Sequence, residues 1–195
     1  MRLVVGLGNP GERYAPTRHN VAWQVLDRLA ERWRAAPAPG TALFEARRAR
    51  VGDREVELMQ PLTYMNRTGE SLTTWMQERG GPPEEWLAVA DDVWLPIGMV
   101  RFRPRGSSGG HRGLASLEAA FGSQEFARLR VGVGAAESQE RLKEHVLAPF
   151  EPEEMMEVKD AVERAADAVA CWLTDGIETA MNRFNRKIVK EVQEP

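Results

Sequence analysis

The sequence predicts an α/β fold: a single-domain three-layer sandwich in which a twisted, mixed β-sheet is flanked by helices. Short apolar runs that are typical of buried strands alternate along the chain with longer segments of helical periodicity. Gly52-Asp53 separates two strand-like segments as a hairpin turn would, so at least one strand pair is antiparallel. With 195 residues, of which 43% are hydrophobic, the chain is long enough for one substantial core, and we expect one domain over residues 1–195.

The first half of the chain alternates between strands and helices, with Pro and Gly at their ends. The first strand contains β-branched residues and is ended abruptly by Gly8, Pro10 and Gly11. The expected elements are a strand at 3–7, a helix at 20–34 ended by the Pro-Ala-Pro-Gly run at 37–40, strands at 43–50 and 55–60, a helix at 70–79 and a strand at 86–90.

The second half begins with strands and becomes helical. A loop rich in glycine and arginine separates two of its elements, and a Thr-Asp-Gly turn divides the last helical region. The expected elements are a strand at 99–103, the loop at 104–113, a helix at 114–121, a strand at 129–134, a helical segment at 140–147, a helix at 153–173, the turn at 174–176 and a final helix to about residue 190.

Composition restricts the class of protein further. No apolar run approaches 18 residues, and the N-terminal segment lacks the apolar region of a signal peptide, so we expect neither a membrane span nor export. The single cysteine, Cys171, excludes an intramolecular disulfide and lies in a helical pattern, where we expect it to pack in the core. We therefore expect a cytoplasmic protein.

Charge is unevenly distributed in a chain whose net charge is −3. Residues 97–134 contain six Arg and two Glu, a difference of +4, whereas residues 137–163 contain nine acidic residues and three Lys or Arg, a difference of −6. The arginines indicate either a phosphate-bearing partner held at one place or a solvated face. The acidic segment is either a solvated helical cover or a lid over a cleft.

Polar side chains follow several of the predicted strands. Asn9, the pair Met65-Asn66 and Asp91 each come directly after an apolar strand or its loop. Because ligands of open α/β sheets bind beyond the carboxyl ends of the strands, we expect these residues on one common rim. For Asp91 and Asp92 a solvated turn or a helix cap is the alternative.

His19 is the best candidate for a general base among the three histidines. An imidazole can take a proton from water near neutral pH, and Asp91 could accept a hydrogen bond from one ring nitrogen and fix the tautomer. A packing role for His19 is the alternative. His19, His111 and His145 lack metal-ligand spacing and no cysteine pair accompanies them, so we expect no metal site.

Two literal motif matches point to other chemistry. Gly6-x-Gly8-x-x-Gly11 satisfies the dinucleotide-binding pattern, but Pro10 and Pro16 argue against a helix that begins at the third glycine. Gly106-x-Ser108-x-Gly110 satisfies the nucleophile-elbow pattern, but its triad would need His145 as base and lacks an evident acid. A glycine-rich loop flanked by arginines fits anion binding at least as well.

Several motifs together resemble the bacterial peptidyl-tRNA hydrolase family over nearly the whole chain. They are GLGNPG at 6–11, Tyr14 with TRHN at 17–20, PLTYMNRTG at 61–69, DDVWLPIG at 91–98, GSSGGHRGL at 106–114, RLRVGVG at 128–134, and TDG at 174–176 with NRFN at 182–185. The resemblance implies a monomeric α/β hydrolase without a cofactor. Such an enzyme cleaves the ester between a peptide and the 3′ end of tRNA with a His-activated water and no covalent intermediate, and so recycles tRNA from stalled translation.

The resemblance also implies roles for individual residues. His19 matches the catalytic base and Asp91 the acid that orients it. The residues it places at the substrate are Asn9, Tyr14, Met65, Asn66, His111 and Arg112, and those it places at the tRNA are Arg103, Arg105 and Arg130.

The chain departs from the family pattern at two positions. Arg112 stands where the family usually has Asn, and a guanidinium cannot accept the hydrogen bond by which an amide oxygen holds water, although it can bind a phosphate. Trp94 stands where an acidic residue is common. Two other functions stay open at this point: an RNA-binding module without catalysis, and an esterase that acts on other substrates.

Overall fold

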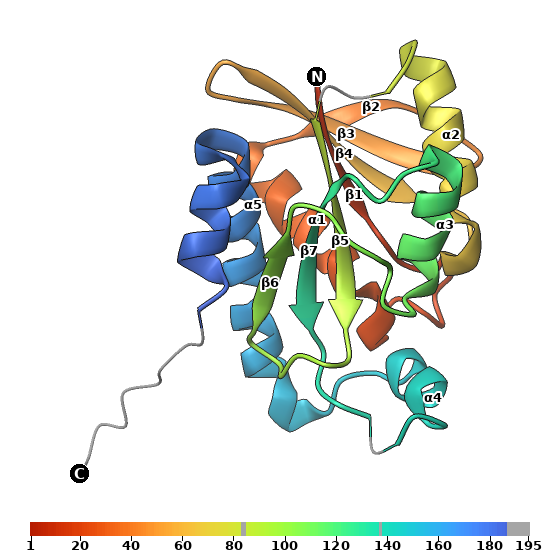
Figure 1. The fold of residues 1–195 in the computed structure, drawn as a ribbon, viewed down its shortest axis with the longest axis vertical. Helices are drawn as coiled ribbons and strands as arrows, with labels where there is room; N and C mark the ends of the chain where they lie inside the picture. Colours follow the sequence, from red (N-terminus) through yellow and green to blue (C-terminus); the bar gives the residue numbers. More distant parts are fainter. Residues whose placement is uncertain (83–84, 137, 187–195) are drawn as a thin grey trace.

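The computed structural model describes residues 1–82, 85–136 and 138–186, and a mixed seven-stranded sheet runs through its centre (Figure 1). The strand order across the sheet is β2-β3-β4-β1-β5-β7-β6. The strands are β1 (Arg2–Gly6), β2 (Ala36–Thr41), β3 (Phe44–Val51), β4 (Arg54–Pro61), β5 (Glu85–Asp92), β6 (Val100–Arg103) and β7 (Ala127–Gly132).

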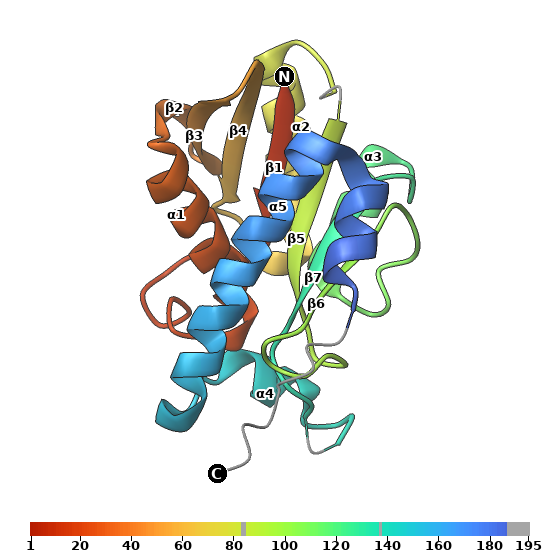
Figure 2. The same cartoon turned by 90° about the vertical axis from the view of Figure 1, so that its left-hand side faces the viewer.

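Helices cover both faces of the sheet, which confirms the predicted three-layer sandwich. The α-helices are α1 (Val21–Trp33), α2 (Thr68–Arg79), α3 (Arg112–Phe121), α4 (Leu142–Leu147) and α5 (Met155–Phe184), and the 3₁₀ helices are η1 (Arg18–Asn20), η2 (Met65–Arg67) and η3 (Pro152–Glu154). Helices α1 and α5 lie on one face and α2 and α3 on the other (Figure 2). Among the described helices, none combines the length and apolar character that crossing a bilayer requires.

The four central strands β4, β1, β5 and β7 are parallel, whereas β3 and β6 pair antiparallel with their neighbours. The carboxyl ends of the parallel strands therefore lie at one edge of the sheet. Side chains that follow these strands meet there, as predicted from the sequence.

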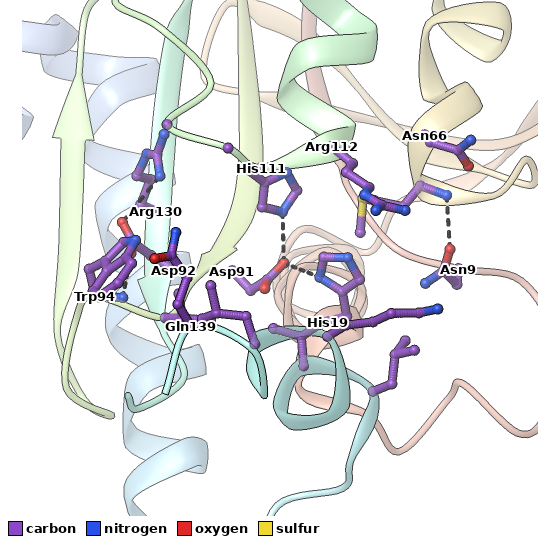
Figure 3. A pocket seen from close by; sticks show the side chains of 18 of the residues that line it. Asn9, His19, Asn66, Asp91, Asp92, Trp94, His111, Arg112, Arg130 and Gln139 are labelled. Atoms are coloured by element: carbon purple, nitrogen blue, oxygen red, sulfur yellow. Dashed lines mark hydrogen bonds and ion pairs between the residues drawn. The ribbon is translucent and has the colours of Figure 1, made fainter. Parts of the chain in front are cut away.

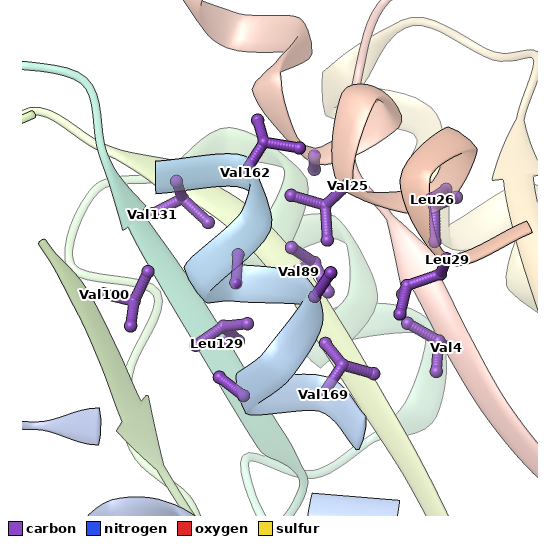
Figure 4. Close-up of a cluster of buried hydrophobic side chains, with 14 of the residues drawn as sticks. Val4, Val25, Leu26, Leu29, Val89, Val100, Leu129, Val131, Val162 and Val169 are labelled. Atoms are coloured by element: carbon purple, nitrogen blue, oxygen red, sulfur yellow. The ribbon is translucent and has the colours of Figure 1, made fainter. Parts of the chain in front are cut away.

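Alternating side chains of the strands fill two separate cores. Val4 and Val89 pack with α1 and α5 on one face (Figure 4), while Leu3, Val5 and Ala88 pack with α2 and α3 on the other. Because both faces are covered, β1 and β5 are apolar at consecutive positions rather than at every second one.

The largest difference from the sequence-based expectation is β2. The Pro-Ala-Pro-Gly run at 37–40 was expected only to end the preceding helix, but α1 ends at Trp33, and these residues form the edge strand next to β3. Prolines are usually excluded from strands because they lack the N–H that pairs with a neighbouring strand. They are tolerated in β2 because it is an edge strand, one side of which has no neighbouring strand.

The last helical region also differs in detail. Gly176 has a positive φ of 85° and a non-helical conformation, so the predicted turn is confirmed as a kink that divides α5 into two helical parts. The second part ends at Phe184, and the predicted end near residue 190 lies outside the described residues. Asn185 then accepts from the Phe102 N–H (2.7 Å) and donates to the Phe102 carbonyl (3.2 Å), which ties the chain to the outer edge of β6. Cys171 is buried against the sheet, as expected.

Candidate active site

A pocket of about 580 Å³ lies at the carboxyl ends of the parallel strands. The predicted common rim is confirmed, because residues that follow β1, β4 and β5 all line this one pocket. Its lining includes the predicted site residues Asn9, Tyr14, His19, Met65, Asn66, Asp91, His111, Arg112 and Arg130. The segment around α4 forms a further wall, with Gln139, Glu140, Leu142, Lys143, Val146 and Leu147, so this part of the acidic region lines the cleft.

The loop after β1 is held against α1 by close contact with an indole. A Cβ at Gly8 would lie 2.5 Å from the ring of Trp23, so only glycine fits there. The Trp23 Nε1 donates to the Gly6 carbonyl (3.0 Å). These contacts with α1 therefore fix the backbone of the loop that leads to Asn9.

Asn9 is positioned by a second asparagine. Asn20 accepts from the Asn9 N–H (2.8 Å) and donates to the Asn9 carbonyl (2.9 Å), and the Asn9 Oδ1 accepts from the Met65 N–H (2.8 Å). Because its side-chain oxygen is occupied in this way, Asn9 has its Nδ2 amide left to donate toward the pocket (Figure 3).

Asp91 joins two imidazoles at the centre of the pocket (Figure 3). Its Oδ1 lies 2.7 Å from His19 Nδ1 and 2.9 Å from His111 Nε2. Burial by itself would raise the pKa of Asp91, but the two imidazoles outweigh it and hold that pKa well below its ordinary value. The carboxyl group is therefore an anion and accepts hydrogen bonds from both rings.

This arrangement makes the two histidines chemically different. His19 donates through Nδ1–H, which leaves its Nε2 with a lone pair. His111 donates through Nε2–H, and its Nδ1 accepts from the Leu114 N–H (3.2 Å) as the N-cap of α3. Both nitrogens of His111 are thus engaged, so only His19 offers a nitrogen that can take a proton from water.

The predicted substrate-side residues lie around this centre. Met65 is buried beneath the pocket, and Asn66 and Arg112 are exposed at its opening. Tyr14 lies at the edge, where its ring meets that of Tyr64 edge-on at 6.2 Å. The Arg112 side chain forms no hydrogen bond or ion pair with another residue in the described part of the chain.

The three predicted tRNA-side arginines are not equivalent. Arg130 lines the pocket, where it donates to the Ser108 carbonyl (2.7 Å) and lies 3.3 Å from Asp92. Arg105 pairs with Glu125 at the surface (3.3 Å), and Arg103 is exposed on β6, so both lie outside the pocket lining.

The sequence reasoning did not single out Arg101, Asn20 or Arg18. Arg101 pairs in register with Arg130 and is exposed on β6, and the alternation of arginines at 101, 103 and 105 was the available signal. Buried Arg18 forms an ion pair with Glu154 (2.6 Å) and fixes η1, which carries His19. Nothing local in the sequence indicates this long-range pairing or that of Asn20 with Asn9.

Among the described residues, His19, Asp91 and His111 also form a group whose ligand atoms, within 4.8 Å of one another, could hold a metal ion. A cation there would replace the two hydrogen bonds to Asp91 and occupy the same ring nitrogens. The mutual hydrogen bonds account for these atoms without an ion.

Neither competing motif has its required context. Gly11 is followed by turns, and the first helical turn begins only at Arg18, so no helix N-terminus lies at the third glycine of the dinucleotide pattern. His145, which a nucleophile at Ser108 would need, lies with Nε2 2.9 Å from the Gly134 carbonyl. The glycine-rich loop is instead held by Arg130 and by Arg128, which donates to the Gly106 carbonyl.

A free imidazole nitrogen, fixed by a buried carboxylate at the carboxyl ends of parallel strands, gives this α/β protein a site that is suited to general-base chemistry. Residues 3–192 match the family model described as peptidyl-tRNA hydrolase. The chain belongs to the peptidyl-tRNA hydrolase family, and it is therefore a hydrolase.

Individual relatives agree with this membership. The chain is 44% identical over 186 residues to a peptidyl-tRNA hydrolase of Thermus thermophilus, covering 95% of this chain and 96% of that protein. It is 41% identical over 187 residues to one of Aquifex aeolicus, covering 96% and 97%. The crystal structure of the Acinetobacter baumannii peptidyl-tRNA hydrolase superimposes with a TM-score of 0.87 at 32% identity, covering 95% of this chain and 94% of that one.

Proposed function

We propose that this protein hydrolyses the ester between a peptide and the 3′ end of tRNA, with a water molecule that His19 Nε2 deprotonates. The observation that carries the mechanism is the difference between the two imidazoles on Asp91: His19 keeps a free nitrogen and His111 does not. The substrate class is supported by the family membership and by the relatives' names.

The geometry supports a direct attack by water. His19 takes a proton from water as the oxygen attacks the ester carbonyl, and the resulting imidazolium is stabilised by the Asp91 anion. The Asn9 Nδ2 amide can donate to the oxyanion of the tetrahedral intermediate. As the intermediate collapses, His19 returns the proton to the departing 3′ oxygen of the ribose, so the products are a free peptide carboxyl group and a tRNA hydroxyl group.

The order of side chains along the rim indicates how the substrate lies. Asn9 and Asn66 lie on the β1 side of His19, whereas Arg130 lies on the β7 side and Arg101 lies beyond it on β6 (Figures 1 and 3). Amides suit a peptide and guanidinium groups suit phosphates. We therefore assign the amide side to the peptide and the arginine side to the tRNA.

The phosphate contacts on the arginine side agree only in part with those that the resemblance implies, because Arg103 is kept and Arg101 is added. The exposed side chains of Arg101 and Arg103 form no hydrogen bond or ion pair in the ranges that the structure describes, so both guanidinium groups are available to phosphate oxygens. Arg130 is engaged with the loop and Asp92, and Arg105 with Glu125. Such contacts position the tRNA without reading its sequence.

Release of the amino acid from an N-blocked aminoacyl-tRNA tests the activity. We expect the wild-type protein to cleave this substrate, and His19→Ala to lose cleavage while it still binds the tRNA. His145→Ala is the matched control, since His145 is outside the pocket lining. Binding without cleavage by the wild type would indicate an RNA-binding module, and cleavage of small esters alone would indicate another esterase.

The salt dependence of binding tests the assignment of the tRNA side. We expect Arg103→Ala to weaken tRNA binding and to reduce the slope of log Kd against log salt by about one unit. Arg50→Ala, an exposed arginine on β3, is the control. An unchanged slope for Arg103→Ala would contradict the assignment to β6.

We also propose that the protein acts as a monomer in the cytoplasm and recycles tRNA from stalled translation. Peptidyl-tRNA arises where translation takes place, which supports the cytoplasmic location. Sedimentation at micromolar concentration should give the 21.9 kDa species.

A further inference from the structure

Trp94 is the one exposed tryptophan of this protein. The chain has six tryptophans, all within the described residues, and Trp94 is 68% exposed while the others are buried or half-buried. Single exposed apolar side chains are common on protein surfaces, but Trp94 also lines the active-site pocket. Trp94 therefore combines high exposure with a position in the pocket lining, which an ordinary surface residue does not have.

Contacts of the neighbouring residues hold the backbone at Trp94 in place, so the indole has a defined position at the pocket. The Trp94 N–H donates to the Asp92 Oδ1 (2.8 Å), and the other Asp92 oxygen lies 3.3 Å from Arg130. The next residue, Leu95, is 2% exposed. The ring therefore leaves a turn that is anchored at both ends.

Trp94 lies on the arginine side of the site. In Figure 3 its ring lies beside Asp92 and Arg130, and Asp91 and His19 separate it from Asn9 and Asn66. If the peptide occupies the amide side and phosphates meet the β6 arginines, the part of the substrate between the reacting ester and these phosphates is the nucleoside end of the tRNA. Its bases are unpaired, and every base has a face that can stack on an aromatic ring.

We propose that Trp94 is a positioning residue that stacks against an unpaired base at the 3′ end of tRNA; this inference rests on the proposed function. An uncharged indole suits a base rather than a phosphate. Tyr64, the other exposed aromatic ring among the described residues, lies next to Met65 and Asn66 on the amide side and is not part of this contact. Stacking on Trp94 would hold the ribose so that its ester carbonyl lies at His19.

Fluorescence titration with a short single-stranded RNA ending in CCA tests the contact without any chemistry. We expect a saturable change in the wild-type emission and a much smaller one in Trp94→Phe, because the other five tryptophans are less exposed. Equal changes in the two proteins would overturn the proposal. This measurement does not depend on cleavage, so it can succeed or fail separately from the proposed function.

Steady-state cleavage of an N-blocked aminoacyl-tRNA tests the role in positioning. We expect Trp94→Leu to raise KM on the order of tenfold, the scale of one lost base stack, with kcat changed less than about twofold. Trp94→Phe keeps an aromatic face and should stay within about threefold of the wild-type KM. Met156→Ala, an exposed apolar residue outside the pocket lining, is the control for a general surface effect.

The outcomes separate the alternatives. An unchanged KM in Trp94→Leu would overturn the proposal, as would equal losses in Trp94→Leu and Trp94→Phe. A defect that grows with peptide length, together with unchanged binding of the RNA, would show that Trp94 contacts the peptide instead. If Trp94→Leu fails to fold by circular dichroism, the comparison of Trp94→Phe with the wild type in the titration still decides.

Discussion

The two functions of the His111 side chain can be separated by two substitutions that each keep one of them. Asn at this position has its Oδ1 near the place of the imidazole Nδ1, so His111→Asn keeps the cap of α3 and loses the bond to Asp91. Gln has its Nε2 near the place of the imidazole Nε2, so His111→Gln keeps a donor to Asp91 and loses the cap. Neither substitution removes a free base, because His111 offers none.

The expected sizes follow from these contacts. A hydrogen bond to a charged group contributes about 1.5–3 kcal/mol, which sets an upper limit of roughly 10–150-fold on the loss of activity in His111→Asn. Since His19 still holds the Asp91 carboxylate at 2.7 Å, we expect a loss near tenfold in kcat. Loss of an N-cap costs about 1 kcal/mol, which lowers Tm by about 2–4 °C in a chain of this length, so His111→Gln should be less stable and nearly fully active.

Single-turnover cleavage of N-blocked aminoacyl-tRNA and thermal unfolding measure the two effects on the same samples. Each variant should lose one property and keep the other. We expect His111→Asn to cleave more slowly with an unchanged Tm, and His111→Gln to have a lower Tm with an unchanged cleavage rate. A loss of 10³-fold or more in both variants would contradict these roles, because His111 would then transfer the proton that the hydrogen bonds assign to His19.

Three further predictions concern residues around the site and one buried charge. Asn20→Ala removes both bonds to the Asn9 backbone and should lower kcat more than it raises KM, measured by steady-state cleavage; an unchanged kcat would contradict the positioning of the Asn9 amide. Arg112→Asn should raise KM about fivefold with kcat retained, because an exposed guanidinium at the pocket opening contributes about 1 kcal/mol to binding the substrate, and equal kinetics would make this side chain a bystander. Glu57 is buried, and although burial raises its pKa, Arg79, Arg48 and Trp75 lower it below its ordinary value overall. The stabilisation from a lowered carboxyl pKa is present above the unfolded-state pKa of about 4.3 and is lost as the pH falls. At pH 7 we therefore expect Glu57→Gln to lower the free energy of unfolding by about 3 kcal/mol, measured by urea denaturation. The difference in this free energy between the variant and the wild type should become smaller below about pH 4. A difference that does not change with pH would contradict the ion pairing.

The sequence allowed the rim to be predicted because its residues follow strands directly. Asn9 and Asp91 come immediately after buried apolar runs, and the parallel order of the strands brings such positions to the same edge. The pairing of His19 with Asp91 could be proposed for the same reason. The position of these residues directly after strands therefore predicted where the site lies in the fold.

Long-range partners were harder to predict. His111 shares the Asp91 oxygen with His19 because a loop after β6 folds back over β5, and no local pattern indicates that return. The Asn20 clamp likewise depends on where η1 meets the first loop. β2 was missed because its prolines, which are typical of a helix end, are also compatible with an edge strand.

His19→Asn separates the base function of His19 from its hydrogen bond to Asp91. Asn Nδ2 has nearly the place of the imidazole Nδ1 and can still donate to Asp91, so this substitution removes the free Nε2 while it keeps the contact that orients the side chain. In single-turnover cleavage of an N-blocked aminoacyl-tRNA, we expect a loss of about 10²–10⁴-fold in rate with tRNA affinity unchanged. A rate within threefold of the wild type would contradict it, because the water would then be deprotonated by another group.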